Sequence, residues 1–191
     1  MAKKQHEKWL IELTSLPTAP GCENRVIAWV EAWVKRRQHV KIQRDQFGNL
    51  LLRRHGRRLS QSPIIFTAHM DHPAFVVRQL ISARQLIGEF RGFVREAFFA
   101  GSKVLLHQSN QSVKRGVVQN TNRLGKEPRY HCAVVQFPTD VAGCIGDLLT
   151  WDSGPARIKQ NRLYAPACDD LSSVAAALAA FDTLVSKGRK D

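Results

Sequence analysis

The sequence predicts an α/β domain that is interrupted by an all-β unit. Three observations support this: helical periodicity near both ends of the chain, an apolar run that stops abruptly at charged residues around 63–71, and almost ninety residues with only short β-like runs after it. A block of strands between helix–strand segments is typical of an inserted domain. We therefore expect residues 1–74 and 162–191 to form the α/β domain, and residues 75–161 to form an inserted barrel or sandwich.

The first fifty residues predict two amphipathic helices and a strand pair. Apolar residues return every three or four positions over residues 3–16 and again over about 23–38, which is the period of a helix with one buried face. The period then changes to two over Val40–Gln43. A turn at Phe47–Asn49 leads into a second strand that begins at Leu50.

The stretch PIIFTAHMD, residues 63–71, is the predicted inner strand. Its continuous apolar and β-branched part, Ile64–Thr67, suits a strand that is buried on both faces of a parallel sheet. It ends at His69 and Asp71, and open α/β sheets place their ligands at the carboxyl ends of such strands. In this H-x-D pattern one ring nitrogen can bind a metal while the carboxylate orients the ring. The alternative is a solvated strand end with an Asp that starts a turn before Pro73.

Short β-like runs separated by glycines fill the middle of the chain, and no helical period interrupts them. The runs are Phe75–Leu80, Gln85–Phe90, Lys103–His107, Ser112–Gln119, Ala133–Phe137 and Asp147–Trp151. This pattern predicts a compact barrel or sandwich. Glu89, Glu96 and Glu127 fall in this part, where we expect them to lie on the surface and to favour solubility.

The α/β pattern returns at Arg162 and ends in an alanine-rich helix predicted over about Leu171–Val185. Asp169 and Asp170 stand directly before that helix. Asp is a favoured helix N-cap, so capping alone explains the pair. The functional interpretation is that Asp169 binds metal, since the two oxygens of one carboxylate can bridge two metal ions, while Asp170 caps or supports the site.

The composition gives less specific information. An apolar fraction of 43% indicates a protein with a core, and 29 Lys and Arg against 16 Asp and Glu give a net charge of +13, which raises nucleic acid as a partner. The positive residues are spread along the chain, however, and the densest cluster, Arg53–Arg58, is explained by a solvated loop.

The four cysteines show no CxxC spacing, and the chain has neither a secretory h-region nor a stretch long enough to span a membrane. We expect a soluble cytoplasmic protein.

The sequence resembles the co-catalytic dinuclear metallo-aminopeptidases, and among them the tetrahedral or glutamyl aminopeptidase group; carboxypeptidase G-like and aminoacylase-like peptidases are more distant relatives. The similar segments span most of the chain. They are LTSLPTAPGCENRVIAWV, DQFGNLLLRRHG, PIIFTAHMDHPAFVV, GDLLTWD and APACDDLSSVAAALAAF. The resemblance implies an incomplete, mixed-sheet, zinc-peptidase-like α/β domain with an inserted β domain that shapes substrate access and makes homo-oligomer contacts.

The resemblance also implies roles for three residues. His69 would be a ligand to one metal ion, Asp71 its partner at the catalytic centre, and Asp169 the carboxylate shared by two divalent metal ions, with zinc favoured over cobalt or manganese. A metal-bound hydroxide would attack the N-terminal peptide bond of a peptide substrate. The pattern departs from the family at His72, where an acidic residue is usual, and at Ser173, where glycine is usual.

The family also carries an adjacent Glu-Glu pair and later metal ligands. This chain has no Glu-Glu pair, and no Glu or His follows Asp170. We therefore expect a truncated N-terminal half of such an enzyme. Two alternatives remain: a basic nucleic-acid-binding module, against which the absence of interleaved aromatics argues, and a catalytically inactive homologue that acts through oligomer contacts.

Overall fold

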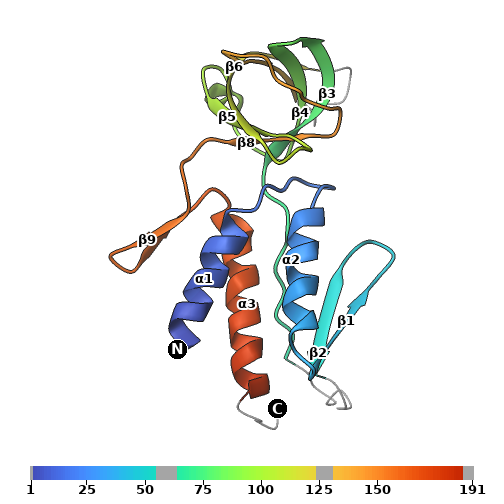
Figure 1. The fold of residues 1–191 in the computed structure, drawn as a ribbon, viewed down its shortest axis with the longest axis vertical. Helices are drawn as coiled ribbons and strands as arrows, with labels where there is room; N and C mark the ends of the chain where they lie inside the picture. The colour runs from blue at the N-terminus through green and yellow to red at the C-terminus, as the bar shows by residue number, and fades with distance from the viewer. Residues whose placement is uncertain (1, 55–63, 124–130, 187–191) are drawn as a thin grey trace. The chain divides into compact units, whose positions relative to one another are not determined.

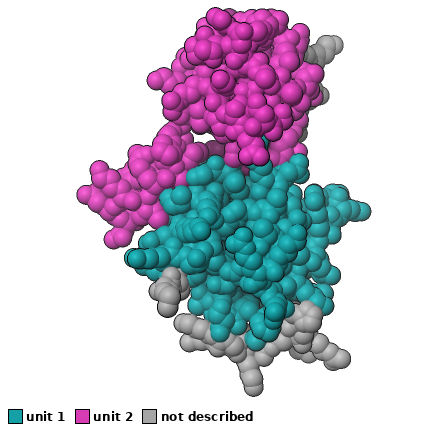
Figure 2. Space-filling model, in the orientation of Figure 1, with its two compact units in different colours: residues 1–16, 24–70, 167–191 teal, residues 17–23, 71–166 magenta. Residues whose placement is uncertain are grey.

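The computed structural model describes residues 2–54, 64–123 and 131–186. Of the predicted basic loop Arg53–Arg58, the first two residues end a strand instead, and the rest lies outside the described residues, as do Pro63 and Glu127. The chain divides into two compact units (Figure 2). Unit 1 contains residues 1–16, 24–70 and 167–191, and unit 2 contains residues 17–23 and 71–166.

Unit 1 is built on three helices (Figure 1): α1 (Ala2–Thr14), α2 (Asn24–Lys35) and α3 (Cys168–Ser186). All three predicted helices are confirmed. They share a core that includes Trp9 and Trp33, whose rings meet edge to face with centroids 5.6 Å apart. Further buried members of this core are Leu13, Val26, Val30, Val34, Val40, Ala167, Leu171, Val174, Ala175 and Leu178.

The predicted strand pair in unit 1 is also confirmed. β1 (Val40–Arg44) and β2 (Leu50–Arg54) form an antiparallel hairpin with Ile42 opposite Leu52. Asp45 holds the turn, because its carboxylate accepts hydrogen bonds from the Asn49 side chain and from the backbone N–H groups of Phe47 and Asn49. These hydrogen bonds, the one from the Asn49 side chain foremost, lower the pKa of Asp45.

The predicted buried strand at 64–67 is wrong. Residues 64–70 form no strand, and the side chains of Ile64, Ile65 and Phe66 are 83%, 70% and 63% exposed. An apolar run becomes a buried strand only if other strands pair with it on the sheet, and no strand of the described residues does so. Ala68 and Met70, by contrast, pack against the helical core and fix the position of the segment.

Unit 2 is built around a closed barrel of six strands in the order β3-β4-β7-β6-β5-β8 (Figure 1). The strands are β3 (Ala74–Ser82), β4 (Gln85–Arg91), β5 (Lys103–His107), β6 (Val113–Arg123), β7 (His131–Gln136) and β8 (Leu148–Trp151), with a 3₁₀ helix η1 (Glu96–Phe98) between β4 and β5. The structure thus decides between the barrel and the sandwich that the sequence left open. Closure pairs every strand on both sides and leaves no free sheet edge.

An aromatic cluster fills the barrel. Phe75, Phe90, Phe99 and Trp151 contact one another with ring centroids 4.8 to 6.0 Å apart. The Trp151 Nε1–H donates to the carbonyl oxygen of Pro73 at 3.0 Å, so its one polar atom is satisfied. The three phenylalanines are buried members of the barrel core, and Trp151 packs against them.

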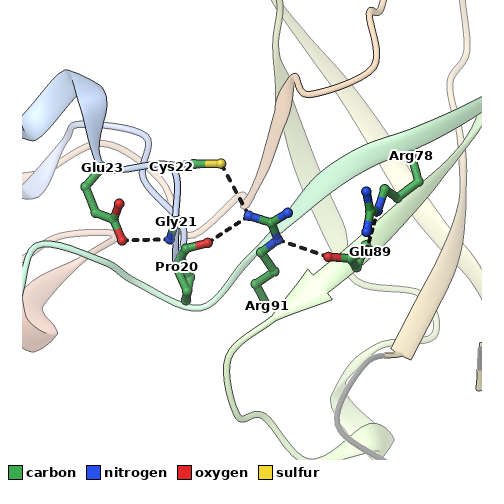
Figure 3. A network of polar contacts seen from close by, with 7 residues as sticks. All are labelled: Pro20, Gly21, Cys22, Glu23, Arg78, Glu89 and Arg91. Atoms are coloured by element: carbon green, nitrogen blue, oxygen red, sulfur yellow. Dashed lines mark hydrogen bonds and ion pairs between the residues drawn. The ribbon is translucent and has the colours of Figure 1, made fainter. Parts of the chain in front are cut away.

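The expectation that Glu89 lies on the surface is wrong. Its side chain is 9% exposed and pairs with two arginines, Arg78 and Arg91 (Figure 3). A β-bulge between Val77 and Gln79 interrupts the register at Arg78. Burial of the carboxylate is tolerated because both of its oxygens accept hydrogen bonds from cationic groups.

Arg91 also fastens the 17–23 segment to the barrel within unit 2 (Figure 3). Its Nη1 donates to the carbonyl oxygen of Pro20 at 2.9 Å and lies 3.5 Å from the Sγ of Cys22. Gly21 sits in the left-handed region with φ +77°, and a Cβ there would lie 3.2 Å from the Arg91 guanidinium. The close passage of this segment over Arg91 therefore favours glycine.

The return of the α/β pattern at Arg162 takes a different form from the one expected. Arg162–Tyr164 is strand β10, and it pairs with β9 (Arg157–Lys159) in a two-stranded sheet of its own (Figure 1). Gln160 and Asn161 make the two-residue turn, with φ of 51° and 58°. In the described part of the chain, no helix is both long and apolar enough to cross a bilayer.

Candidate metal centre

His69 and Asp169 lie side by side in unit 1. The His69 Nε2 is 3.2 Å from the Asp169 Oδ1. Both side chains are open to solvent, with 52% and 89% exposed. An exposed His–Asp pair contributes only about 0 to 1 kcal/mol to the free energy of unfolding. Stabilisation of the fold therefore does not account for the close approach of the two side chains.

The start of α3 positions the two aspartates. Asp169 and Asp170 have non-helical backbone angles, and the peptide bond between them is cis. The Oδ2 of Asp170 accepts a hydrogen bond from the backbone N–H of His69 at 3.2 Å. Asp170 therefore ties the 64–70 segment to the helix, while Asp169 meets the His69 ring. The sequence-based interpretation assigned Asp170 a capping or supporting role but did not name His69 as its contact.

The His69 nitrogen and the Asp169 oxygen match part of the coordination shell of a divalent cation. Imidazole nitrogen and carboxylate oxygen are zinc ligands at about 2.0 to 2.2 Å, and two such ligands at a tetrahedral angle lie about 3.4 Å apart. The observed 3.2 Å between Nε2 and Oδ1 is compatible with that spacing. Among residues 2–54, 64–123 and 131–186, however, no three His, Cys, Asp or Glu side chains are arranged to hold one ion. The described residues thus offer two ligands, and water or further groups must supply the rest.

The other residues that the sequence singled out are distributed over both units. Asp71 and His72 are half-buried residues without regular secondary structure, and they begin the second stretch of unit 2. Ser173 lies in the first turns of α3 and is exposed. The Glu89 carboxylate forms ion pairs with Arg78 and Arg91 in the barrel, which makes it a poor candidate for a general base.

Comparison with known proteins adds information on the fold. No protein-family model matches the chain, and no curated protein sequence matches it. Solved structures of aminopeptidases do match. An aminopeptidase from the archaeon Desulfurococcus kamchatkensis superposes with a TM-score of 0.71 at 22% identity, over 94% of this chain and 52% of that one.

Two further structures agree with this match. The TET aminopeptidase from a marine sediment Thaumarchaeota archaeon gives a TM-score of 0.76 at 14% identity, over 100% of this chain and 56% of that one. The TET1 peptidase of Pyrococcus horikoshii, described as assembling into a tetrahedron or a large octahedral shell, gives 0.71 at 19%, over 95% and 57%. The chain thus has the fold of these aminopeptidase structures and spans little more than half of their length.

Proposed function

We propose that this chain is part of a metal-dependent hydrolase of the aminopeptidase type that acts on peptides. The observation that carries the proposal is the 3.2 Å approach of the His69 Nε2 to the Asp169 Oδ1. A fold shared with solved aminopeptidases supports it independently. Peptide hydrolysis and metal dependence are both part of this proposal.

The proposed site would hold a divalent ion through His69 and Asp169, with zinc favoured over cobalt or manganese. The second oxygen of Asp169 would be available to a second ion. A bound ion would supply Lewis-acid polarisation of the peptide carbonyl and lower the pKa of a water molecule. The role of the protein is to orient the ligands, and Asp170 contributes by fixing the His69 backbone. Asp71 is proposed as the carboxylate that orients the His69 ring, on the H-x-D spacing alone.

A complete site needs more groups than these. Zinc takes about three protein ligands and a water molecule in catalytic sites, and hydrolysis needs a general base. Since the chain spans 52 to 57% of the length of the solved aminopeptidases, we propose that the remaining ligands and the base come from polypeptide beyond these 191 residues. Homo-oligomer formation through unit 2 is proposed by analogy with the structures whose names describe a dodecamer and a tetrahedron.

Zinc titration by calorimetry tests the proposed site. We expect binding to the unsubstituted chain and loss of that binding in His69→Ala and in Asp169→Asn, each of which removes one ligand atom. Matched controls are His39→Ala and Asp140→Asn, which change an exposed imidazole and an exposed carboxylate elsewhere. Equal zinc affinity in all five proteins would overturn the proposed site.

Hydrolysis of aminoacyl p-nitroanilides tests the reaction separately. Zinc-dependent release of p-nitroaniline, lost in Asp169→Asn, would support the full proposal. Zinc binding that depends on His69 and Asp169 without any hydrolysis would instead indicate an inactive homologue or a need for the further polypeptide proposed above. The two assays therefore distinguish failure of the metal site from failure of the chemistry.

A further inference from the structure

The β9–β10 hairpin carries one face of positive charge. Arg157 stands opposite Tyr164, and Lys159 stands opposite Arg162. Residues opposite each other and residues two apart share a face of an antiparallel pair, so all four side chains lie on one face. Three of the four are cations. We define these four residues as the cationic face of the hairpin.

No acidic residue lies beside these cations along the sequence. Residues 153–168 contain no Asp or Glu. Lys159 and Arg162 form no ion pair with any residue of the described ranges, and the Arg157 guanidinium lies over the Tyr164 ring, 5.1 Å from its centroid. Like charges directly opposite each other on a hairpin are destabilising. An anion between Lys159 and Arg162 would remove that cost.

The hairpin also offers backbone for pairing. It forms a two-stranded sheet separate from the barrel, and its strands are three residues long. An isolated two-stranded hairpin is marginally stable, and a third strand would stabilise it. Lysine and arginine on an edge keep neutral strands away, but they favour a strand of opposite charge. On the other face, Ile158 is 38% exposed and offers apolar contact.

We propose that the cationic face of the β9–β10 hairpin binds an extended acidic peptide segment that adds a strand to the hairpin. In an extended peptide, carboxylates at alternate positions point to one side, which matches the two-residue spacing of Arg157 and Lys159. Single-stranded nucleic acid fits less well. Base stacking needs free aromatic faces, and Tyr164, the one aromatic of this face, already contacts Arg157.

Another hairpin of the chain provides the control. In β1–β2, Lys41 also stands opposite Arg53, so the same charge reversal can be made there. That hairpin differs because Ile42 and Leu52 pack it against the core of unit 1. Lys159→Glu/Arg162→Glu and Lys41→Glu/Arg53→Glu therefore change net charge equally but act on different surfaces.

Fluorescence anisotropy with a labelled, N-acetylated peptide of alternating Glu and Thr tests the proposal; acetylation and added EDTA exclude hydrolysis. We expect binding at about 50 mM salt that weakens strongly by about 500 mM. Lys159→Glu/Arg162→Glu should weaken binding about tenfold or more, the Gln double variant less, and Lys41→Glu/Arg53→Glu about twofold at most. Circular dichroism would check that each variant is folded.

Three outcomes would overturn the proposal: no binding at low salt, equal loss in both charge-reversed variants, or equal binding of a Lys–Thr peptide. Tighter binding of an oligothymidylate than of the acidic peptide, lost in the same hairpin variant, would assign the surface to nucleic acid instead. None of these outcomes depends on the metal site.

Discussion

The side chains of His69 and Asp169 meet at 3.2 Å although 100 positions separate them in the sequence. A second link lies beside this pair, since Asp170 accepts a hydrogen bond from the His69 backbone. The segment at 64–70 has no ladder hydrogen bonds to a neighbouring strand of the described residues, so this link to α3 matters more for its position than it would inside a sheet.

The first prediction concerns Asp170. Asp170→Ala removes the acceptor for the His69 N–H but leaves both proposed metal ligands in place. We expect zinc affinity to fall about tenfold to a hundredfold, the range for loss of a group that orients a ligand. Competition with a chromophoric chelator measures this. Unchanged affinity would show that Asp170 serves only the helix.

The second prediction concerns the ion pairs of the barrel. Arg91→Met leaves the nearly buried Glu89 with one cation and also frees the carbonyl oxygen of Pro20. We expect the free energy of unfolding to fall by about 2 to 4 kcal/mol in urea denaturation. Arg84→Met, which removes an exposed pair with Asp140, should cost about 0 to 1 kcal/mol. A similar loss of unfolding free energy in both variants would show that burial of Glu89 does not make its ion pairs more stabilising than exposed ones.

The third prediction concerns Gly116. A Cβ at this position would lie 2.7 Å from a ring carbon of Phe137 and 2.8 Å from a methyl of Val135. Gly116→Ala should therefore destabilise the barrel by about 1 to 3 kcal/mol through overpacking. Gly143→Ala is the matched control, because its nearest neighbour would be at 3.5 Å, an ordinary contact. Thermal unfolding of the two variants compares them directly.

The fourth prediction concerns alkaline pH. Burial, together with the negative charge of Glu89, raises the pKa of the Cys132 thiol, and Arg78 opposes this. The folded protein thus retains a proton that the unfolded chain releases, so stability falls as pH rises past the ordinary thiol pKa of about 8.5. Urea denaturation between about pH 7 and 10 should show a shallower loss in Cys132→Ala. Cys144→Ala, which removes a thiol at an exposed site, is the matched control.

Local sequence patterns predicted a helix or strand correctly where the spacing of its own apolar residues defines the buried face. The helical periods over residues 3–16 and 23–38 and the β-like runs from Phe75 to Trp151 correspond to observed helices and strands, since a period of 3.6 or 2 determines which face is apolar. Ile64–Thr67 failed for a reason that the run itself does not contain. Whether an extended apolar segment is a buried strand depends on partners from elsewhere in the chain.

Ion pairs between side chains of neighbouring strands could not be predicted from the sequence either. Glu89 looks like an ordinary exposed carboxylate, because its neighbours in sequence do not reveal that β3 brings Arg78 beside it. The same holds for the cationic face of the β9–β10 hairpin. Its charges are spaced unremarkably along the chain and gather only when the Gln160–Asn161 turn pairs the two strands.

The sequence by itself determined the helices, the β-rich middle and the candidate pair His69 and Asp169, because periodicity and residue chemistry are local properties. Only the tertiary structure decided that the middle closes into a barrel, that Glu89 is buried, that residues 64–67 pair with no strand of the described residues, and that Asp170 reaches His69. Each of these depends on which distant segments come together, and that is settled by packing of the whole unit rather than by any stretch of sequence.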